Sequence, residues 1–343
     1  MEQDMGFRVA VVGATGLVGQ QVLRVLEERR FPVEELRPLA TSRSAGRTVE
    51  FGGTTWEVGE ATAGALAGVD FAFFAASGDV SKELAPVAAR AGAVVIDKSN
   101  TFRMDPEVPL VVPEVNGHAL ARHRNLIASP NCSTIQLVVA LKPILDRFGL
   151  EQVVVSTYQA VSGTGAAALD ELEAEVRAGV EGRVHGPQVY PQPIAFNVLP
   201  HCDRFEAEGY TLEEWKLVRE TRKILEQPGL AVTATAVRVP VRVGHSEAVW
   251  LRTREEATVD DLRSALQAAP GVVVVDDPGA GAYPTPLQVA GRDEVYVGRL
   301  RHDPAVPRAF WLWIVADNLR KGAATNAVQI AEALVAAGAP SRH

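Results

Sequence analysis

The chain has 343 residues, of which 47% are hydrophobic and 22% are charged, as in a typical soluble globular protein. At roughly 150 residues per domain, this length predicts about two domains. The net charge is −8, and the sequence lacks the long basic block expected of a protein that binds nucleic acid or an anionic membrane. No apolar run approaches the roughly 20 residues of a membrane helix. We therefore expect neither nucleic acid nor a membrane as a partner.

The two cysteines, Cys132 and Cys202, are too few for a disulfide framework. We expect both to be reduced thiols in a reducing compartment. The acidic start of the chain, Met1 to Asp4, has neither the cationic beginning nor the apolar core of a signal peptide. These features predict a cytoplasmic protein.

The first part of the chain alternates short apolar runs with amphipathic segments. Strands are predicted at 7–12, 36–40, 71–74, 94–96, 110–112 and 126–128, and helices at 16–28 and 80–91. Fully apolar strands alternating with helices are typical of a parallel sheet that is covered on both faces. We expect a Rossmann-type α/β domain over residues 1–129.

The pattern changes after Pro130. Helices are predicted from 133 to 141 or beyond, where Pro143 would limit or kink the helix, and at 166–178, 210–226 and 317–337. Strands are predicted at 153–158, 232–239, 248–253, 272–275, 295–300 and 310–316, with an irregular Pro- and Gly-rich connection at 182–200. This pattern predicts an α+β domain on a broad sheet over 130–316, and a C-terminal helix in 317–343 that packs on the first domain.

A glycine-rich turn follows the first strand and opens the first helix. It reads Gly13-Ala14-Thr15-Gly16-Leu17-Val18-Gly19. Such glycines permit close approach of the backbone to phosphate, and the helix N-terminus offers N–H groups to a pyrophosphate. A plain turn with small residues for packing is the alternative, but the strand–turn–helix context favours a dinucleotide.

The end of the second strand bears on which dinucleotide binds. An Asp or Glu there would bond the ribose 2′-hydroxyl of NAD. This sequence has no acid in the segment from Thr41 to Gly46, and it has Arg43 among hydroxyl side chains. A guanidinium in that setting suits a 2′-phosphate, although a solvated loop arginine is the alternative. The segment therefore favours NADP over NAD.

Cys132 lies at the predicted first turn of a helix, after Asn131. Unpaired N–H groups and the helix dipole lower the pKa of a thiol at that position, and Asn131 could donate to a developing oxyanion. Most cysteines without a disulfide are instead small buried hydrophobes, which is our interpretation of Cys202. Beside a nicotinamide cofactor, a nucleophilic cysteine predicts acyl chemistry through a thioester.

Such chemistry also needs an acid or base. His245 lies between two β-type runs and directly follows a glycine, and Arg238, seven residues earlier, could hold a substrate carboxylate. An interior histidine and two surface arginines, Arg238 and Arg242, are the alternative from the residues alone.

Taken together, the chain resembles the aspartate-β-semialdehyde dehydrogenase family. The matching segments lie in the family's order and span nearly the whole chain: GATGLVG at 13–19, SNTFR at 99–103, SPNCSTIQ at 129–136, QAVSG at 159–163, EEWK at 213–216, RVPVRVGHSE at 238–247 and ADNLRKG at 316–322.

The resemblance implies a catalytic and dimerisation role for the second domain and a role for each matching position. Cys132 would be the nucleophile, His245 the acid/base, and Gln159 the residue that orients the reacting groups. Substrate would be bound by Arg103 and Lys216 at its phosphate, Asn131 at the phosphate or oxyanion, Arg238 at its carboxylate and Glu213 at its ammonium. The cofactor would be bound by Gly13, Thr15, Gly16, Leu17, Val18, Thr41, Arg43, Ser44, Ser162, Gly163 and Asn318. No metal is implied.

The implied activity is phosphate-dependent reduction of 4-phospho-L-aspartate to L-aspartate 4-semialdehyde with NADP. It would serve lysine, threonine, methionine and diaminopimelate biosynthesis, and the enzyme would be a homodimer. The first alternative is N-acetyl-γ-glutamyl-phosphate reductase, in which the substrate amine is acetylated and a carboxylate such as Glu213 has no charged partner. The second is a non-catalytic NADP-sensing protein, which would need the glycine loop but not Cys132, Gln159, Arg238 and His245 together.

Overall fold

The structure is a computed structural model that describes residues 6–339. Our interpretation of Met1 to Asp4 lies outside the described residues. The chain divides into two compact units. The first contains the described residues of Met1–Asn131 and Ala323–His343, and the second is Cys132–Gly322.

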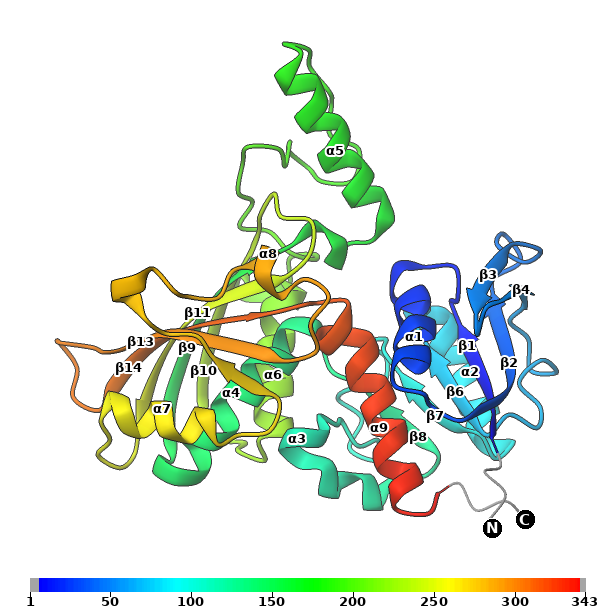
Figure 1. The fold of residues 1–343 in the computed structure, drawn as a ribbon, viewed down its shortest axis with the longest axis horizontal. Coiled ribbons are helices and arrows are strands. Elements are labelled where there is room, and N and C mark those ends of the chain that lie inside the picture. The colour runs from blue at the N-terminus through cyan, green and yellow to red at the C-terminus, as the bar shows by residue number, and fades with distance from the viewer. Residues whose placement is uncertain (1–5, 340–343) are drawn as a thin grey trace. The chain divides into compact units, whose positions relative to one another are not determined.

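The first unit is built on a six-stranded parallel sheet of order β5-β2-β1-β6-β7-β8 (Figure 1). Its strands are β1 Phe7–Val12, β2 Val33–Ala40, β5 Gly59–Glu60, β6 Phe71–Phe74, β7 Val94–Asp97 and β8 Leu126–Ala128, and β3 Thr48–Phe51 and β4 Thr54–Glu57 form a separate hairpin. Its helices are α1 Leu17–Glu28, α2 Gly78–Arg90, α3 Pro113–Asn116, η1 Gly117–Arg122 and α9 Thr325–Ala336.

Alternate residues of the central strands fill two separate cores in this unit. Val9 and Val11 of β1 pack with residues of α1 and α9 on one face, whereas Ala10 and Val12 pack with residues of α2 on the other. This period of two is what a sheet covered on both faces requires. The predicted Rossmann-type domain, with the C-terminal helix packed on it, is confirmed.

The second unit is built on a mixed six-stranded sheet of order β10-β9-β11-β14-β13-β12. Its strands are β9 Leu150–Gln159, β10 Ala231–Arg238, β11 His245–Thr253, β12 Val272–Val274, β13 Val295–His302 and β14 Ala309–Ala316. Its helices are α4 Cys132–Phe148, α5 Ala166–Val180, α6 Leu212–Ile224, α7 Val259–Gln267 and α8 Pro286–Val289, with short 3-10 turns η2 Val161–Gly163, η3 Ala207–Gly209 and η4 Pro278–Ala280. A π-helical turn, η5 Arg320–Ala324, precedes α9.

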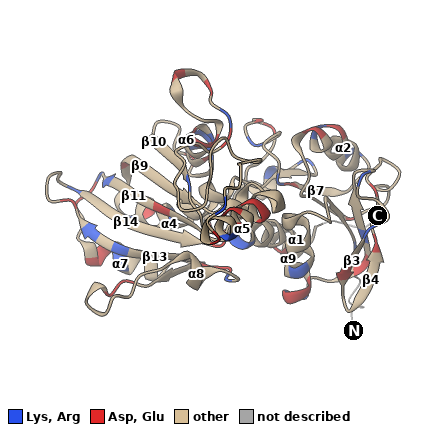
Figure 2. Ribbon diagram, turned by 90° about the horizontal axis from the view of Figure 1, so that it is seen from above, with Lys and Arg blue, Asp and Glu red and all other residues tan. Residues whose placement is uncertain are grey.

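The two faces of this second sheet differ. Helices α4, α6 and α7 pack on one face. The other face carries partly exposed aromatic side chains, of which Trp250 and Trp311 lie directly opposite each other on β11 and β14. In Figure 2 the strands of this sheet are mostly tan, so few charged residues lie on them. The predicted α+β domain on a broad sheet is confirmed, and one face of that sheet is left open.

Some predicted elements differ in the structure. The strand predicted at 110–112 is reduced to a single bridge from Leu110 to Ala128, because Pro109 and Pro113 flank it and Pro113 begins α3. Pro143 does not end α4, which continues to Phe148. The hairpin of β3 and β4 was not predicted, although its turn, Gly52-Gly53, has the positive φ angles (63° and 71°) that a two-residue hairpin favours.

The irregular connection after α5 is held by two buried carboxylates. Helix α5 stands away from the sheet (Figure 1). Glu171 accepts hydrogen bonds from the main-chain N–H groups of residues 188–190, and Glu175 accepts them from Ile194 and Ala195, both at 2.8 Å. Both glutamates are about 5% exposed. Side chains of the helix therefore replace the backbone partners that this connection lacks.

Candidate active site

Cys132 and His245 form a close pair at one end of the second unit. Cys132 is the first residue of α4, as predicted, and His245 is the first residue of β11. The Cys132 Sγ lies 3.3 Å from the His245 Nε2. Cys132 is partly exposed as a residue, whereas His245 is completely buried. The fold therefore brings together, across 113 residues of sequence, the predicted nucleophile and the predicted acid/base group.

The main chain fixes the tautomer of His245. The N–H of Ala160 donates to Nδ1 at 3.0 Å. Because a main-chain N–H can only donate, Nδ1 is unprotonated and the neutral ring carries its proton on Nε2, which faces the sulfur. The pKa of His245 is lowered to about 3, first by burial and then by the charge of Arg238, while Glu213 opposes the change.

Gln159, the last residue of β9, is held by two side chains beside this pair. Its Nε2 donates to Glu213 Oε1 at 2.8 Å and to Ser133 Oγ at 3.0 Å. Ser133 in turn donates to the same carboxylate oxygen at 3.1 Å. The Gln159 Oε1 is buried and has no hydrogen-bond partner among the described residues. The amide is thus locked at its nitrogen, and its oxygen remains as an acceptor.

Arg238 ends β10 directly beside Gln159 in the register of the sheet. Its NH1 donates to the Ala160 carbonyl at 2.8 Å, while its Nε is buried without a partner among the described residues. A Cβ at Gly163 would lie 3.2 Å from the Arg238 NH1 and from the His245 Nε2. Gly163 therefore keeps this corner of the site open, and Arg238 has donor capacity left for an anion.

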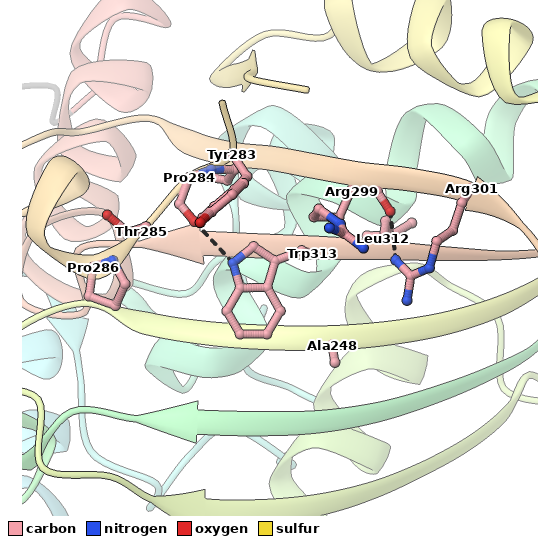
Figure 3. Close-up of a pocket in the computed structure, with 9 residues that line it drawn as sticks. All are labelled: Ala248, Tyr283, Pro284, Thr285, Pro286, Arg299, Arg301, Leu312 and Trp313. Atoms are coloured by element: carbon pink, nitrogen blue, oxygen red, sulfur yellow. Dashed lines mark hydrogen bonds between the residues drawn. The ribbon is translucent and has the colours of Figure 1, made fainter. Parts of the chain in front are cut away.

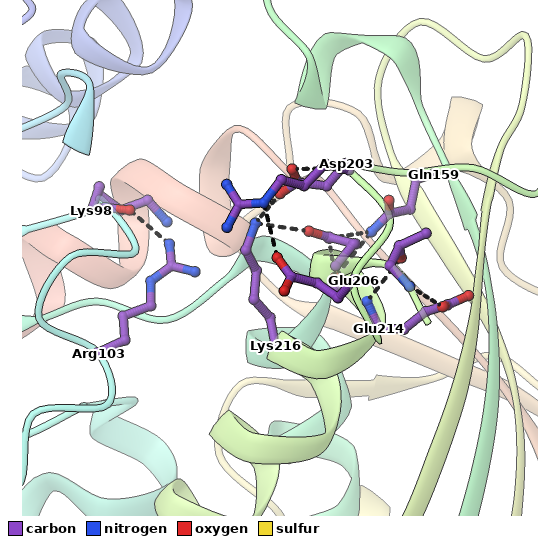
Figure 4. Close-up of polar contacts among 11 residues, drawn as sticks. Lys98, Arg103, Gln159, Asp203, Glu206, Glu214 and Lys216 are labelled. Carbon is purple, nitrogen blue, oxygen red and sulfur yellow. Dashed lines mark hydrogen bonds and ion pairs between the residues drawn. The ribbon is translucent and has the colours of Figure 1, made fainter. Parts of the chain in front are cut away.

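Glu213 and Lys216 lie three residues apart on α6, as predicted. The Lys216 Nζ lies 3.3 Å from Glu213 and 2.7 Å from Asp203, and Figure 4 shows Lys216 reaching from the helix toward Asp203. Glu214, the neighbour of Glu213, forms a capping box with Thr211 at the start of the helix. This box fixes where α6 begins and so places Glu213 next to Gln159.

In the first unit, two carbonyl groups hold Arg103. Its Nε donates to Ser129 at 3.1 Å and its NH2 donates to Lys98 at 2.7 Å, and the side chain is buried (Figure 4). These carbonyls follow β7 and β8, so the ends of two strands fix the guanidinium. Asn131 is also buried, directly before α4.

The glycine turn of the first unit fits a dinucleotide phosphate. Gly13 has φ +89°, and a Cβ there would lie 2.4 Å from the Ala75 carbonyl oxygen. A Cβ at Gly19 would lie 2.1 Å from the Gly13 carbonyl oxygen, so this glycine lets α1 pack against the turn. No side chain caps α1, and its first turn, which includes Leu17 and Val18, contains no acid. The N-terminus of α1 therefore offers positive partial charge at the turn formed by Thr15 and Gly16.

The predicted 2′-phosphate residues form an exposed turn after β2. The Ser44 N–H donates to the Thr41 carbonyl at 2.8 Å. Arg43 is exposed, and its guanidinium makes no hydrogen bond among the described residues. The turn thus presents a free cation between two hydroxyl side chains.

Asn318 has a different setting from the one that its predicted role suggests. Its Nδ2 donates to Ser162 Oγ at 3.0 Å, and its Oδ1 accepts from the Gly244 N–H at 2.9 Å. The side chain is buried. In the second unit Asn318 therefore ties Ser162 to the residue that precedes His245.

Sequence reasoning missed three participants: Ser133, the main chain of Ala160 and Gln136. The Gln136 Nε2 donates to the His245 carbonyl at 3.3 Å. Ser133 directly follows the nucleophile, and Gln136 lies one helical turn beyond it, so helical spacing from Cys132 was the available signal. The hydrogen bond from the Ala160 N–H to His245 Nδ1 depends on strand register, and no sequence pattern indicates it.

A separate cavity of about 350 Å³ lies on the open face of the second sheet. Tyr283, Pro284, Arg299, Arg301 and Trp313 are among its lining residues, and the Trp313 indole donates to the Pro284 carbonyl at 3.0 Å (Figure 3). It contains none of the predicted site residues.

Among residues 6–339, no group of three or more His, Cys, Asp or Glu side chains is arranged to hold a metal ion. None of the helices in that part of the chain combines the length and the apolar character that a membrane span needs.

Comparison with known families gives matches in both units. A family model described as "Semialdehyde dehydrogenase, NAD binding domain" matches residues 8–123. A second, described as "Semialdehyde dehydrogenase, dimerisation domain", matches residues 141–321. Together they cover most of the chain.

Similar proteins and structures agree with these matches. The chain is 52% identical to aspartate-semialdehyde dehydrogenase of Aquifex aeolicus, over 97% of this chain and 99% of that protein. It is 54% identical to the Legionella pneumophila enzyme of the same name, over 95% of each. The structure resembles aspartate semialdehyde dehydrogenase II of Vibrio cholerae complexed with ASA, at 47% identity and TM-score 0.93, over 97% of this chain and 99% of that one. It also resembles the Candida albicans enzyme solved with NADP, at 25% identity and TM-score 0.74, over 97% and 99%.

Proposed function

The chain belongs to the aspartate-semialdehyde dehydrogenase family, and from this we propose that it catalyses the NADP-dependent, phosphate-dependent interconversion of 4-phospho-L-aspartate and L-aspartate 4-semialdehyde. The observation that carries the proposal is the 3.3 Å contact between Cys132 Sγ and His245 Nε2 at the start of α4. Gln159, Arg238 and Glu213 surround this contact within the same unit.

The reaction proceeds through a thioester on Cys132. In the reductive direction the thiolate attacks the carbonyl carbon of the acyl phosphate, and the carbon–oxygen bond to phosphate breaks. The Nε2–H of His245 donates a hydrogen bond to the carbonyl oxygen as that oxygen gains negative charge. Gln159 orients the reacting groups. After reduction of the thioester carbonyl, the carbon–sulfur bond breaks, which releases the aldehyde and restores the thiolate.

The reduced cofactor NADPH, when bound, would supply the hydride for that reduction. In the first unit, the glycine turn from Gly13 to Val18 would hold its pyrophosphate, and Arg43 with Thr41 and Ser44 would hold its 2′-phosphate. We also assign Ser162, Gly163 and Asn318, which belong to the second unit, to the binding of NADP. The positive φ of Gly13, its close approach to the Ala75 main chain and the uncapped start of α1 support this assignment.

The substrate carries both negative and positive groups, so its binding requires side chains of both charges. Arg238 would bind its carboxylate and Glu213 its ammonium, while Arg103, Lys216 and Asn131 would bind the phosphate. The unpartnered Nε of Arg238 supports the first assignment. Because this protein has a net charge of −8, local cations must capture the anionic substrate against the overall field.

We further propose that the enzyme is a cytoplasmic homodimer, joined through the open face of the second sheet, that serves lysine, threonine, methionine and diaminopimelate biosynthesis. Neither Cys132 nor Cys202 is in a disulfide bond, which is in keeping with a reducing compartment.

The deciding experiment measures phosphate-dependent reduction of NADP, and separately of NAD, with L-aspartate 4-semialdehyde and with N-acetyl-L-glutamate 5-semialdehyde. We expect turnover with the free amine only, because Glu213 provides a carboxylate partner for an ammonium. Cys132→Ala should abolish turnover and leave NADPH binding intact. Preference for the acetylated substrate would instead identify the protein as an N-acetyl-γ-glutamyl-phosphate reductase. Near-normal rates in Cys132→Ala would refute the thioester mechanism.

A further inference from the structure

Glu247 is a completely buried acid that the proposed reaction does not use. It is 0% exposed on β11, two residues after His245 and on the same face of the strand. Neither carboxyl oxygen has a hydrogen-bond partner among the described residues. A carboxylate without a partner is one of the most costly groups to bury. The position therefore requires an uncharged acid or a function that justifies the charge.

The Gln136 side chain connects this acid to the reactive pair. Gln136 lies four residues after Cys132 on α4, and its Nε2 donates to the main-chain carbonyl of His245. The same amide lies close enough to Glu247 to lower the pKa of its carboxyl, although no hydrogen bond joins the two side chains. Cys132 and Gln136 on the helix thus face His245 and Glu247 on the strand as two successive pairs.

The surroundings of Glu247 favour the uncharged form. Burial raises its pKa well above the ordinary value, the Gln136 amide opposes this change, and the charge of Glu213 on α6 adds to it. No cation contributes to the change in that pKa. Thr157 lies directly opposite on β9, and its hydroxyl oxygen has no partner among the described residues, so it can accept the acid proton.

We propose that Glu247 is a positioning residue, kept as an uncharged acid, that fixes His245 against the start of α4 through the Gln136 side chain. A negative charge at this place would stabilise an imidazolium and repel the Cys132 thiolate. The inference deepens the proposed function and rests on it for the identity of the reaction. Its physical content, an uncharged acid that sets the reactivity of a thiol, can be tested without the substrate.

The test uses Glu247→Gln and Glu247→Leu in the full-length enzyme. Three readouts are taken: the pH profile of Cys132 alkylation by iodoacetamide, kcat and KM with L-aspartate 4-semialdehyde, and the infrared carbonyl band of a protonated carboxylic acid at pH 7. Burial raises the pKa of Cys202 to about 12, so the alkylation reports on Cys132.

Glu247→Gln mimics the uncharged acid. We expect it to retain the alkylation profile and kcat within about threefold, and to lose the infrared band. Glu247→Leu removes the polar group beside the Gln136 amide, so kcat should fall by about tenfold or more with little change in KM, and the alkylation profile should move. Gln136→Met should reproduce that shift, which keeps the test available if Glu247→Leu does not fold.

Val249→Ala is the matched control, because Val249 is the next inward residue of β11 and is equally buried. It should lower Tm without moving the alkylation profile. The proposal is overturned if Glu247→Leu and Gln136→Met both alkylate like the wild type, if the infrared band is absent, or if Val249→Ala shifts the profile equally. A wild-type enzyme inactive on the semialdehyde would refute the proposed function alone, since the alkylation and infrared results would still stand.

Discussion

At His245, one main-chain N–H decides which ring nitrogen carries the proton and faces the Cys132 sulfur. The Ala160 N–H occupies Nδ1, and therefore the proton of the neutral ring lies on Nε2 beside the sulfur. An imidazolium would have to place a second proton against that N–H. The same contact thus orients the ring and disfavours its charged form, as burial and Arg238 also do.

The depressed pKa of His245 predicts how stability depends on pH. In the unfolded chain this histidine takes up a proton below about 6.5, whereas in the folded protein its pKa is about 3. The unfolded state then binds more protons between these two values, so this group makes the free energy of unfolding fall as pH drops from about 6.5 toward 3. His245→Gln should flatten that slope, as measured by urea unfolding at a series of pH values. His302→Gln, on the exposed end of β13, is the control, and equal slopes for wild type and His245→Gln would contradict the prediction.

Arg43 is expected to set the cofactor preference. Arg43→Ala removes a charge-assisted contact worth about 1.5–3 kcal/mol, so KM for NADP should rise by roughly tenfold to a hundredfold while that for NAD changes little. Arg47→Ala, an exposed arginine four residues later, should leave both values near the wild type. Steady-state rates with each cofactor would check this, and an unchanged NADP preference in Arg43→Ala would assign the 2′-phosphate to another residue.

At the scale of single elements, pattern alone predicted most strands and helices, because the strands are continuously apolar, as in β6, or alternate apolar with polar residues, as in β10. The exceptions have local causes. The bridge at Leu110 lies between two prolines, and the predicted final helix begins only at Arg320, with a π-helical turn. The contacts that assemble the site could not be predicted from the sequence pattern. Glu213 lies 80 residues from Ser133 and 54 from Gln159, and only strand register and helix packing bring them together.

The glycine turn gives a prediction for α1. Gly19→Ala would place a methyl group 2.1 Å from the Gly13 carbonyl oxygen, so α1 must shift and the free energy of unfolding should fall by about 1–3 kcal/mol. Gly16→Ala is the matched control, because its Cβ would meet only the Gly13 oxygen at 3.4 Å. It should change the free energy of unfolding by less than about 1 kcal/mol. Chemical denaturation of both variants would check this, and equal losses would show that Gly19 does not limit the packing.

At the scale of the whole molecule, the open face of the second sheet is the surface that the proposed dimer would use. Tyr158 and Trp313 are in ring contact there with centroids 5.4 Å apart, and Tyr158 is 38% exposed. A cluster of aromatic side chains on a strand face is typical of an interface core.

Trp313→Glu should therefore give monomers, because it would bury a charge in that interface. Light scattering after size-exclusion chromatography would measure the mass. Thr54→Glu, which adds the same charge at an exposed strand position of the first unit, should leave the mass unchanged. A Trp313→Glu protein with wild-type mass would place the interface elsewhere.

The two buried glutamates of α5 have a consequence for how this chain can change over evolutionary time. Their carboxylates accept hydrogen bonds from main-chain N–H groups of the connection and not from its side chains. Every amino acid except proline provides such an N–H group. Substitutions at Gln188 or Val189 can thus accumulate while the connection keeps its conformation. Both glutamates, in contrast, must be retained. The conformation of that connection is therefore determined by side chains of the preceding helix, α5.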